Sequence, residues 1–71
     1  MNLLEVPEGR ELQIKKIEAG TALLLRLSEL GLFEGSKIEV LRNRNGSVIL
    51  KIFGSTLAIG RGQANKIEVV E

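Results

Sequence analysis

The sequence is poor in the side chains that carry most enzyme chemistry. It contains no His, Cys, Asp, Tyr or Trp, so every acidic residue is a glutamate. Its serine and threonine hydroxyls have no imidazole to activate them, and a lone hydroxyl is a weak nucleophile. Glu5, Glu8 and Glu11 surround a predicted turn, where we expect a solvated edge instead of an acid–base pair. The sequence therefore predicts no catalytic residues and a protein that is not an enzyme.

Metal binding would have to depend on carboxylates, backbone oxygens and the Met1 thioether. Glu29 and Glu34 could approach each other at the end of a helix, but two carboxylates alone hold a transition metal weakly. We therefore predict no cofactor apart from a weakly held divalent transition metal, and we assign no metal ligands.

The remaining polar feature is a set of basic residues that flank a predicted hairpin, namely Arg42, Arg44 and Lys51. Small barrels that bind nucleic acid usually stack bases on aromatic side chains. Phe33 and Phe53 are the only aromatic residues here, and both are assigned to the core. The net charge of +1 also gives little bulk attraction for phosphates. We expect the basic residues to solvate the hairpin and its edges, and we predict no nucleic-acid partner.

The elements that must position these side chains are one helix and several strands, and the helix is predicted between Gly20 and Gly35. Residues 22–30 contain no Gly, Pro or β-branched residue, so nothing interrupts about two to three helical turns. Thr21 is predicted to cap the amino end through its hydroxyl. Gly31 is predicted to end the helix by adopting a left-handed conformation.

The leucines of this helix divide between two sides. At about 100° per residue, Leu23, Leu27 and Leu30 fall on one stripe, which we assign to the core. Leu24 lies beside that stripe, and Leu25 points nearly opposite to it. A short helix on a small sheet cannot bury both sides, so a loop must cover Leu24 and Leu25 or a partner must contact them.

Apolar runs bounded by turn residues predict about five short strands. Six runs are candidates for these strands, at residues 3–6, 11–18, 37–43, 47–53, 56–59 and 66–70. Leu12, Ile14 and Ile17 can share the core side only if a β-bulge lies near Lys15-Lys16.

Turn residues also fix two connections. Asn45-Gly46 between two β-rich runs predicts a hairpin, because both residues tolerate positive φ. Gly54-Ser55 predicts a second tight turn. Ile49 and Phe53 face away from the core side of their strand, so we predict that the helix covers this outer face.

The chain is predicted to be one domain, residues 1–71, that is mainly β. The fold class is a small SH3-like, partly open barrel of about five strands, with one short α-helix inserted between the second and third strands. A split α+β sheet is the alternative. The absence of cysteine is compatible with the cytoplasm, and no apolar run is long enough for a membrane span.

The order of these features resembles the FeoA family, the small cytoplasmic proteins that accompany the bacterial ferrous iron permease. The resemblance includes Pro7-Glu8-Gly9, the run Ile17-Glu18-Ala19-Gly20 and the closing residues Leu57-Ala58-Ile59 and Ile67-Glu68-Val69. Its most specific part is Arg26-Leu27-Ser28-Glu29-Leu30-Gly31-Leu32 with Gly35, which looks like the family pattern R-L-x-E-L-G-L-x-x-G. The hairpin between residues 42 and 46 is shorter than is usual in the family.

The resemblance implies an SH3-like barrel that acts by contact with the cytoplasmic, GTP-hydrolysing part of the permease and supports ferrous iron uptake. It implies an association with the membrane only through that partner. Family members are often described as binding transition metals, and the same fold occurs in iron-dependent repressors. A metal-responsive regulatory module and a nucleic-acid-binding barrel are therefore the alternative functions.

The helix combines the family pattern with an apolar side that its own core does not need. We therefore predict Leu24, Leu25, Arg26 and Ser28 as the partner-binding residues. An apolar anchor at the centre of such a patch typically carries most of the binding energy. Exposed strand edges leave self-association of the chain as a further expectation.

Overall fold

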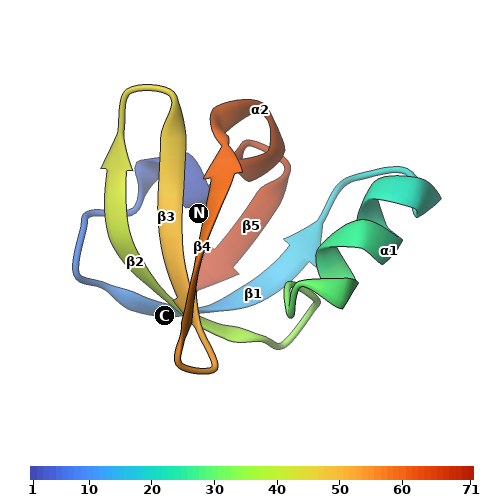
Figure 1. The fold of residues 1–71 in the computed structure, drawn as a ribbon, viewed down its shortest axis with the longest axis horizontal. Helices are drawn as coiled ribbons and strands as arrows, with labels where there is room; N and C mark the ends of the chain where they lie inside the picture. The colour runs from blue at the N-terminus through green and yellow to red at the C-terminus, as the bar shows by residue number, and fades with distance from the viewer.

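Five antiparallel strands form one curved sheet in the computed structural model, which describes all residues from 1 to 71 (Figure 1). The spatial order is β4-β3-β2-β1-β5, so the first and last strands of the chain are neighbours. The strands are β1 (Glu11–Ile17), β2 (Lys37–Arg44), β3 (Ser47–Ile52), β4 (Ser55–Gly60) and β5 (Ile67–Val70). The helices are the 3-10 helix η1 (Leu3–Glu5), α1 (Thr21–Glu29) and α2 (Arg61–Ala64).

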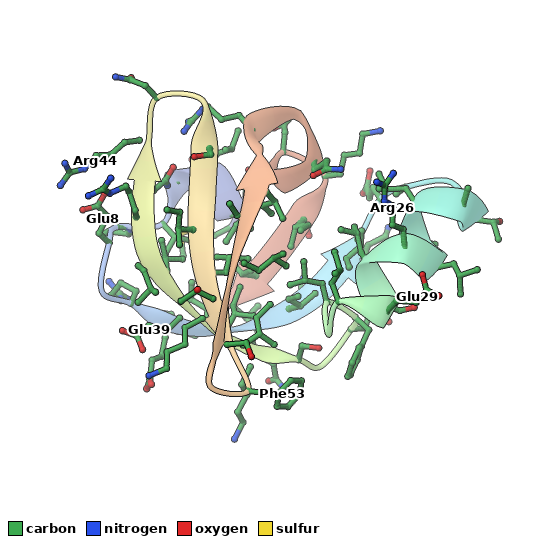
Figure 2. All side chains as sticks on the ribbon, in the orientation of Figure 1. Glu8, Arg26, Glu29, Glu39, Arg44 and Phe53 are labelled. Atoms are coloured by element: carbon green, nitrogen blue, oxygen red, sulfur yellow. The ribbon has the colours of Figure 1, made fainter.

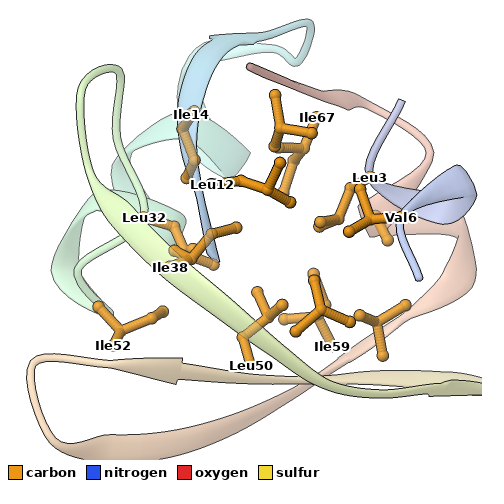
Figure 3. Close-up of a cluster of buried hydrophobic side chains, with 14 of the residues drawn as sticks. Leu3, Val6, Leu12, Ile14, Leu32, Ile38, Leu50, Ile52, Ile59 and Ile67 are labelled. Atoms are coloured by element: carbon orange, nitrogen blue, oxygen red, sulfur yellow. The ribbon is translucent and has the colours of Figure 1, made fainter. Parts of the chain in front are cut away.

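The core lies inside the curve of this sheet and contains sixteen buried apolar residues (Figure 3). Alternate residues of each strand point into it, as the two-residue period of a strand requires. On β3, for example, Val48, Leu50 and Ile52 are buried while Lys51 is exposed. The mainly β, SH3-like fold predicted from the sequence is confirmed.

A β-bulge in β1 resolves the irregular spacing of its apolar residues. The pairing of β1 with β5 shifts register between Ile14 and Lys16. Leu12, Ile14 and Ile17 are consequently all buried, whereas Lys15 and Lys16 are exposed. The bulge predicted near Lys15-Lys16 is confirmed.

The hairpin between β2 and β3 is also confirmed at Asn45-Gly46, although only Gly46 adopts a positive φ, of 82°. The second hairpin turns one residue earlier than predicted. Its two turn residues are Phe53 and Gly54, with φ of 51° and 81°, and Ser55 already belongs to β4. Two successive left-handed residues are typical of the tightest β-hairpin turns.

The first apolar run is a 3-10 turn instead of a strand. Asn2 accepts a hydrogen bond from the N–H of Leu4 through its side chain, and the Glu5 carboxylate accepts one from the N–H of Asn2. This capping box favours a helical turn over an extended chain. The inserted helix α1 therefore follows the first strand of the sheet, and not the second.

Two details of α1 differ from the sequence-based prediction. The helix begins at Thr21 itself, so Gly20 is the capping residue and no side chain caps the end. On the core side, Leu27 is 1% exposed and Leu23 is half-buried, but Leu30 is 47% exposed. Leu30 escapes burial because it follows the last helical residue and adopts a non-helical ψ near 0°. Gly31 ends the helix as predicted, with φ of 93°.

The position of α1 was predicted wrongly. Figure 1 shows the helix beside β1, at the side of the barrel, and not over the outer face of β3. That face is partly open to solvent, because Ile49, the apolar residue that β3 presents there, is only half-buried. No helix of the chain is both long enough and apolar enough to cross a membrane.

Candidate functional site

A shallow groove of about 410 Å³ lies between α1, the end of β1 and the loop that follows α1. Its seven lining residues are Ile17, Thr21, Leu24, Leu25, Ser28, Phe33 and Glu34. We call this feature the α1 groove. Three of the four residues predicted to bind a partner, Leu24, Leu25 and Ser28, line it. The fourth, Arg26, does not.

Helical spacing explains how the groove forms. Thr21, Leu24, Leu25 and Ser28 stand at positions i, i+3, i+4 and i+7, which lie on one face of a helix. The buried Leu27 stands about 60° from Leu24 and about 160° from Leu25 around the helix axis, and it enters the core. One face of α1 therefore attaches the helix to the barrel, and the other presents apolar side chains outward. No loop covers Leu24 or Leu25, whose side chains are 38% and 61% exposed.

The loop after α1 contributes Phe33, which the sequence analysis wrongly assigned to the core. Its N–H donates to the Ser36 hydroxyl at 3.1 Å, and that hydroxyl donates to the carbonyl of Gly31 at 2.8 Å. Ser36 is itself 3% exposed, so these bonds form inside the protein and fix the loop. Phe33 thereby lies against the groove while 45% of it stays exposed.

Phe53 is exposed as well, so the prediction that this second aromatic residue lies in the core is also wrong. It occupies the β3–β4 turn at a positive φ, which is uncommon for a bulky residue. Its ring lies at the end of α1, because a Cβ atom added to Gly31 would be 3.4 Å from Cε2 of Phe53. Figure 2 shows Phe53 on the same side of the molecule as the carboxyl end of α1.

A second hollow, also of about 410 Å³, is lined in part by Phe53. Charged residues of both signs surround it, among them Glu11, Lys37, Glu39 and Lys51. Glu39 and Lys51 are directly opposite each other in the β2–β3 ladder, so their charges face one another across the strands.

The basic residues do not form a single patch. Arg44 forms an ion pair with Glu8, in which the Nε–Oε2 distance is 3.0 Å, and Asn43 donates its N–H to the same oxygen at 2.9 Å (Figure 2). Both hydrogen bonds lower the pKa of the Glu8 carboxyl below its ordinary value, and the bond from Arg44 has the larger effect. Lys51 lies near the opposite end of β3, at the turn that contains Phe53.

The carboxylates show no metal cluster. No group of three or more His, Cys, Asp or Glu side chains gathers anywhere in the 71 residues. Glu34 lines the α1 groove, but Glu29 is not among the residues that line it. The pair considered from the sequence therefore has no third carboxylate beside it.

The fold and the groove define a class, a small SH3-like barrel with an exposed apolar groove on its inserted helix. The family model described as the FeoA domain matches residues 1–71, and the chain belongs to this family. The resemblance seen in the sequence is thus confirmed.

Named relatives agree with this assignment. The chain is 52% identical over 62 residues to "Putative Fe(2+) transport protein A" of Methanocaldococcus jannaschii, which covers 87% of this chain and 76% of the relative. The crystal structure of the iron uptake regulatory protein FeoA has a TM-score of 0.89 at 28% identity, covering 97% of this chain and 93% of that one. A manganese-dependent transcriptional repressor has a TM-score of 0.87 at 25% identity, and the match covers 99% of this chain but 40% of the repressor.

Proposed function

We propose that this chain is a non-enzymatic accessory protein of ferrous iron uptake, which acts by contact with the cytoplasmic GTP-hydrolysing domain of a ferrous iron permease. Membership of the FeoA family and the 52% identity to a protein named for Fe(2+) transport support the transport role. The observation that carries the contact role is the α1 groove, in which Leu24, Leu25 and Phe33 are exposed together.

Leu25 is the anchor of the proposed contact. It is the most exposed leucine of α1, with 61% of its surface open, and its apolar neighbours in the groove are Ile17, Leu24 and Phe33. Burying a leucine side chain fully contributes about 2 kcal/mol relative to leaving it in water. A partner helix or loop that covers Leu25 would cover Leu24 and Phe33 at the same time. Partner contacts of this kind are dominated by a few central apolar residues.

Polar side chains at the rim of the groove determine which polar groups a partner can carry there. Ser28 donates its hydroxyl to the carbonyl of Leu25 at 2.7 Å, so its oxygen keeps only acceptor capacity for a partner. Glu34 adds a negative charge at the same rim. Arg26 lies outside the groove and is assigned to the periphery of the interface, where a charge affects association rate more than affinity. The groove therefore fits an apolar segment that carries a hydrogen-bond donor or a positive charge beside it.

The variant Leu25→Glu tests the contact. It introduces a charge at the centre of the groove without touching the core, so binding to the purified GTPase domain should weaken by at least about tenfold. Isothermal titration calorimetry measures the affinity, and circular dichroism reports the fold. The full-length permease in detergent is titrated as well, because the binding site could include both of its parts.

The matched control is Leu41→Glu, since Leu41 is a leucine of β2 with 38% exposure that does not line the α1 groove. It should bind as the wild type does. Wild-type affinity in Leu25→Glu would refute the groove as the contact surface, and absence of binding in the unmodified protein would refute the accessory role.

A metal-responsive regulatory module is the second candidate function. The structural likeness to a manganese-dependent transcriptional repressor favours it. A weakly bound divalent transition metal would then shift amide resonances of a defined set of residues during titration with Mn(II), Fe(II) or Zn(II). Broadening by Mn(II) or Fe(II) spread evenly over all glutamates would indicate non-specific association with surface carboxylates and would exclude this function.

A further inference from the structure

The two outer strands of the sheet, β4 and β5, differ in whether the backbone N–H and C=O groups on their outer edges form hydrogen bonds. The outer edge of β5 is covered by the first residues of the chain. Val69 donates its N–H to the carbonyl of Met1 at 2.7 Å, the Met1 amino group donates to the carbonyl of Val69 at 3.3 Å, and Asn2 forms a β-bridge with Glu68. The edge of β4 has no such cover, because no hydrogen bond joins residues 55–59 to a segment other than β3.

The register of the β3–β4 hairpin identifies the backbone groups that remain free. The turn has two residues, and the pair that closes it is Ile52 with Ser55. In such a hairpin the closing pair exchanges both hydrogen bonds, and pairs along an antiparallel ladder then alternate. The six pairs of this ladder follow without a register shift. Thr56 and Ala58 therefore direct their N–H and C=O groups away from β3.

Strand β4 also lacks the features that usually protect a free edge. Its sequence, Ser-Thr-Leu-Ala-Ile-Gly, contains no charged residue and no proline, and its pairing contains no bulge. Charges, prolines and bulges are the common means by which edge strands avoid pairing with another chain. The side chains of Thr56 and Ala58 are exposed and small, so they do not hinder an approaching strand.

We propose that β4 pairs antiparallel with β4 of a second copy of this chain, around a two-fold axis at Leu57. In this register Thr56 lies opposite Ala58 of the second copy, and the two copies of Leu57 face each other. Both outward-facing residues of each copy are then used, which gives about four intermolecular hydrogen bonds. The two five-stranded sheets become one continuous ten-stranded sheet.

We expect β4 to pair with a second copy of the chain because its free N–H and C=O groups are complementary to those of an identical strand. Thr56 and Ala58 are placed symmetrically about Leu57, which is the condition for an isologous strand pair. The strand carries no charge that would be set against its own image, and the whole chain has a net charge of only +1. The edge includes no residue of the α1 groove, so this pairing does not depend on the proposed transport function.

Sedimentation equilibrium combined with amide hydrogen exchange tests the pairing on the full chain. As the concentration rises from micromolar to millimolar, the apparent mass should approach twice that of the monomer. Over the same range the amides of Thr56 and Ala58 should become protected. The amide of Leu57, which is already bonded to β3, should not change its protection by this pairing.

The variant Ala58→Pro removes one outward N–H and leaves the ladder with β3 intact, because that N–H is not used within the monomer. It should weaken the dimer by about tenfold or more, since two of the four bonds are lost by symmetry. If proline disturbs the fold, as judged by circular dichroism, Ala58→Lys makes the same test by placing a charge on the edge. Asn45→Lys adds the same charge at the β2–β3 turn, outside β4, and should dimerise as the wild type does.

Three results would overturn the proposal. The chain could stay monomeric at millimolar concentration, or it could dimerise without protection of Thr56 and Ala58. Alternatively, both amides could become protected in a monomer only when the permease's GTPase domain is added, which would assign the edge to a strand of that partner.

Discussion

Phe53 illustrates at the level of a single residue why a pattern of apolar residues can mislead. The alternation of β3 placed it on the outer face, and its aromatic character suggested burial. The turn begins one residue earlier than expected, so Phe53 leaves the strand and adopts a φ of 51°. Its ring then contacts the end of α1 near Gly31 instead of entering the core. Nothing in the local sequence marks this contact, because it joins segments more than twenty residues apart.

Gly31 should be among the glycines that tolerate substitution least. It combines a φ of 93° with close neighbours, since an added Cβ atom would lie 3.1 Å from Cγ2 of Ile52. Gly31→Ala should lower the free energy of unfolding by about 1–3 kcal/mol. Urea denaturation followed by circular dichroism measures this difference.

The control is Gly62→Ala, because Gly62 lies in α2, has no atom within 4 Å of an added Cβ and has no left-handed backbone. Alanine is about 1 kcal/mol more favourable than glycine in a helix, so this variant should be as stable as the wild type or slightly more stable. Equal losses in both variants would show that the backbone of Gly31 carries no special strain.

Glu8 gives the stability of the protein a specific dependence on pH. The bonds from Arg44 and Asn43 lower its pKa, so the folded chain favours the charged carboxylate. This contribution is fully present above the ordinary glutamate pKa of about 4.3, and it is lost as the pH falls through the lowered value. The melting temperature of Glu8→Gln should therefore fall less steeply with acidification than that of the wild type.

Thermal melting at a series of pH values provides the comparison, with Glu29→Gln as control, because Glu29 forms no ion pair. The wild type and Glu8→Gln should converge at the lowest pH. A constant difference at every pH would show that the Glu8 carboxylate is not the group responsible.

At the level of the element, α1 has two faces with opposite roles. Leu27 is the only fully buried residue of the helix, whereas Leu30 is half exposed at its end. Leu27→Ala should reduce the free energy of unfolding by about 2–5 kcal/mol, the usual cost of removing a core leucine. Leu30→Ala should change it by no more than about 0.5 kcal/mol. Chemical denaturation of both variants measures the two free energies of unfolding. Equal losses would mean that Leu27 does not attach α1 to the core more strongly than Leu30 does.

The sequence predicted most elements, because their signals are local. The Asn45-Gly46 hairpin, the bulge in β1 and the end of α1 at Gly31 depend on nearby residues, and all three are present. The α1 groove could be predicted in part, since helical spacing separates Leu25 from Leu27. Phe33 could not be assigned to it, because its place depends on the hydrogen bonds of Ser36, which lie in an irregular loop.

At the level of the whole molecule, the two proposed contact surfaces share no residue. The α1 groove is lined by residues between 17 and 34, and the free edge of β4 includes residues 55–59. A substitution on one surface therefore leaves the residues of the other unchanged, so the two contacts can be tested separately.

The pairing of both chain ends within one sheet also bears on the synthesis of the protein. Strand β1 pairs with β5, and Met1 covers the outer edge of β5, so the first and last residues complete the same part of the barrel. These contacts span nearly the entire chain, and contacts of long sequence separation form slowly. Strand β1 is synthesised before its pairing strand β5. Folding of the barrel must therefore be completed after translation of residues 67–70, when both ends of the chain can meet.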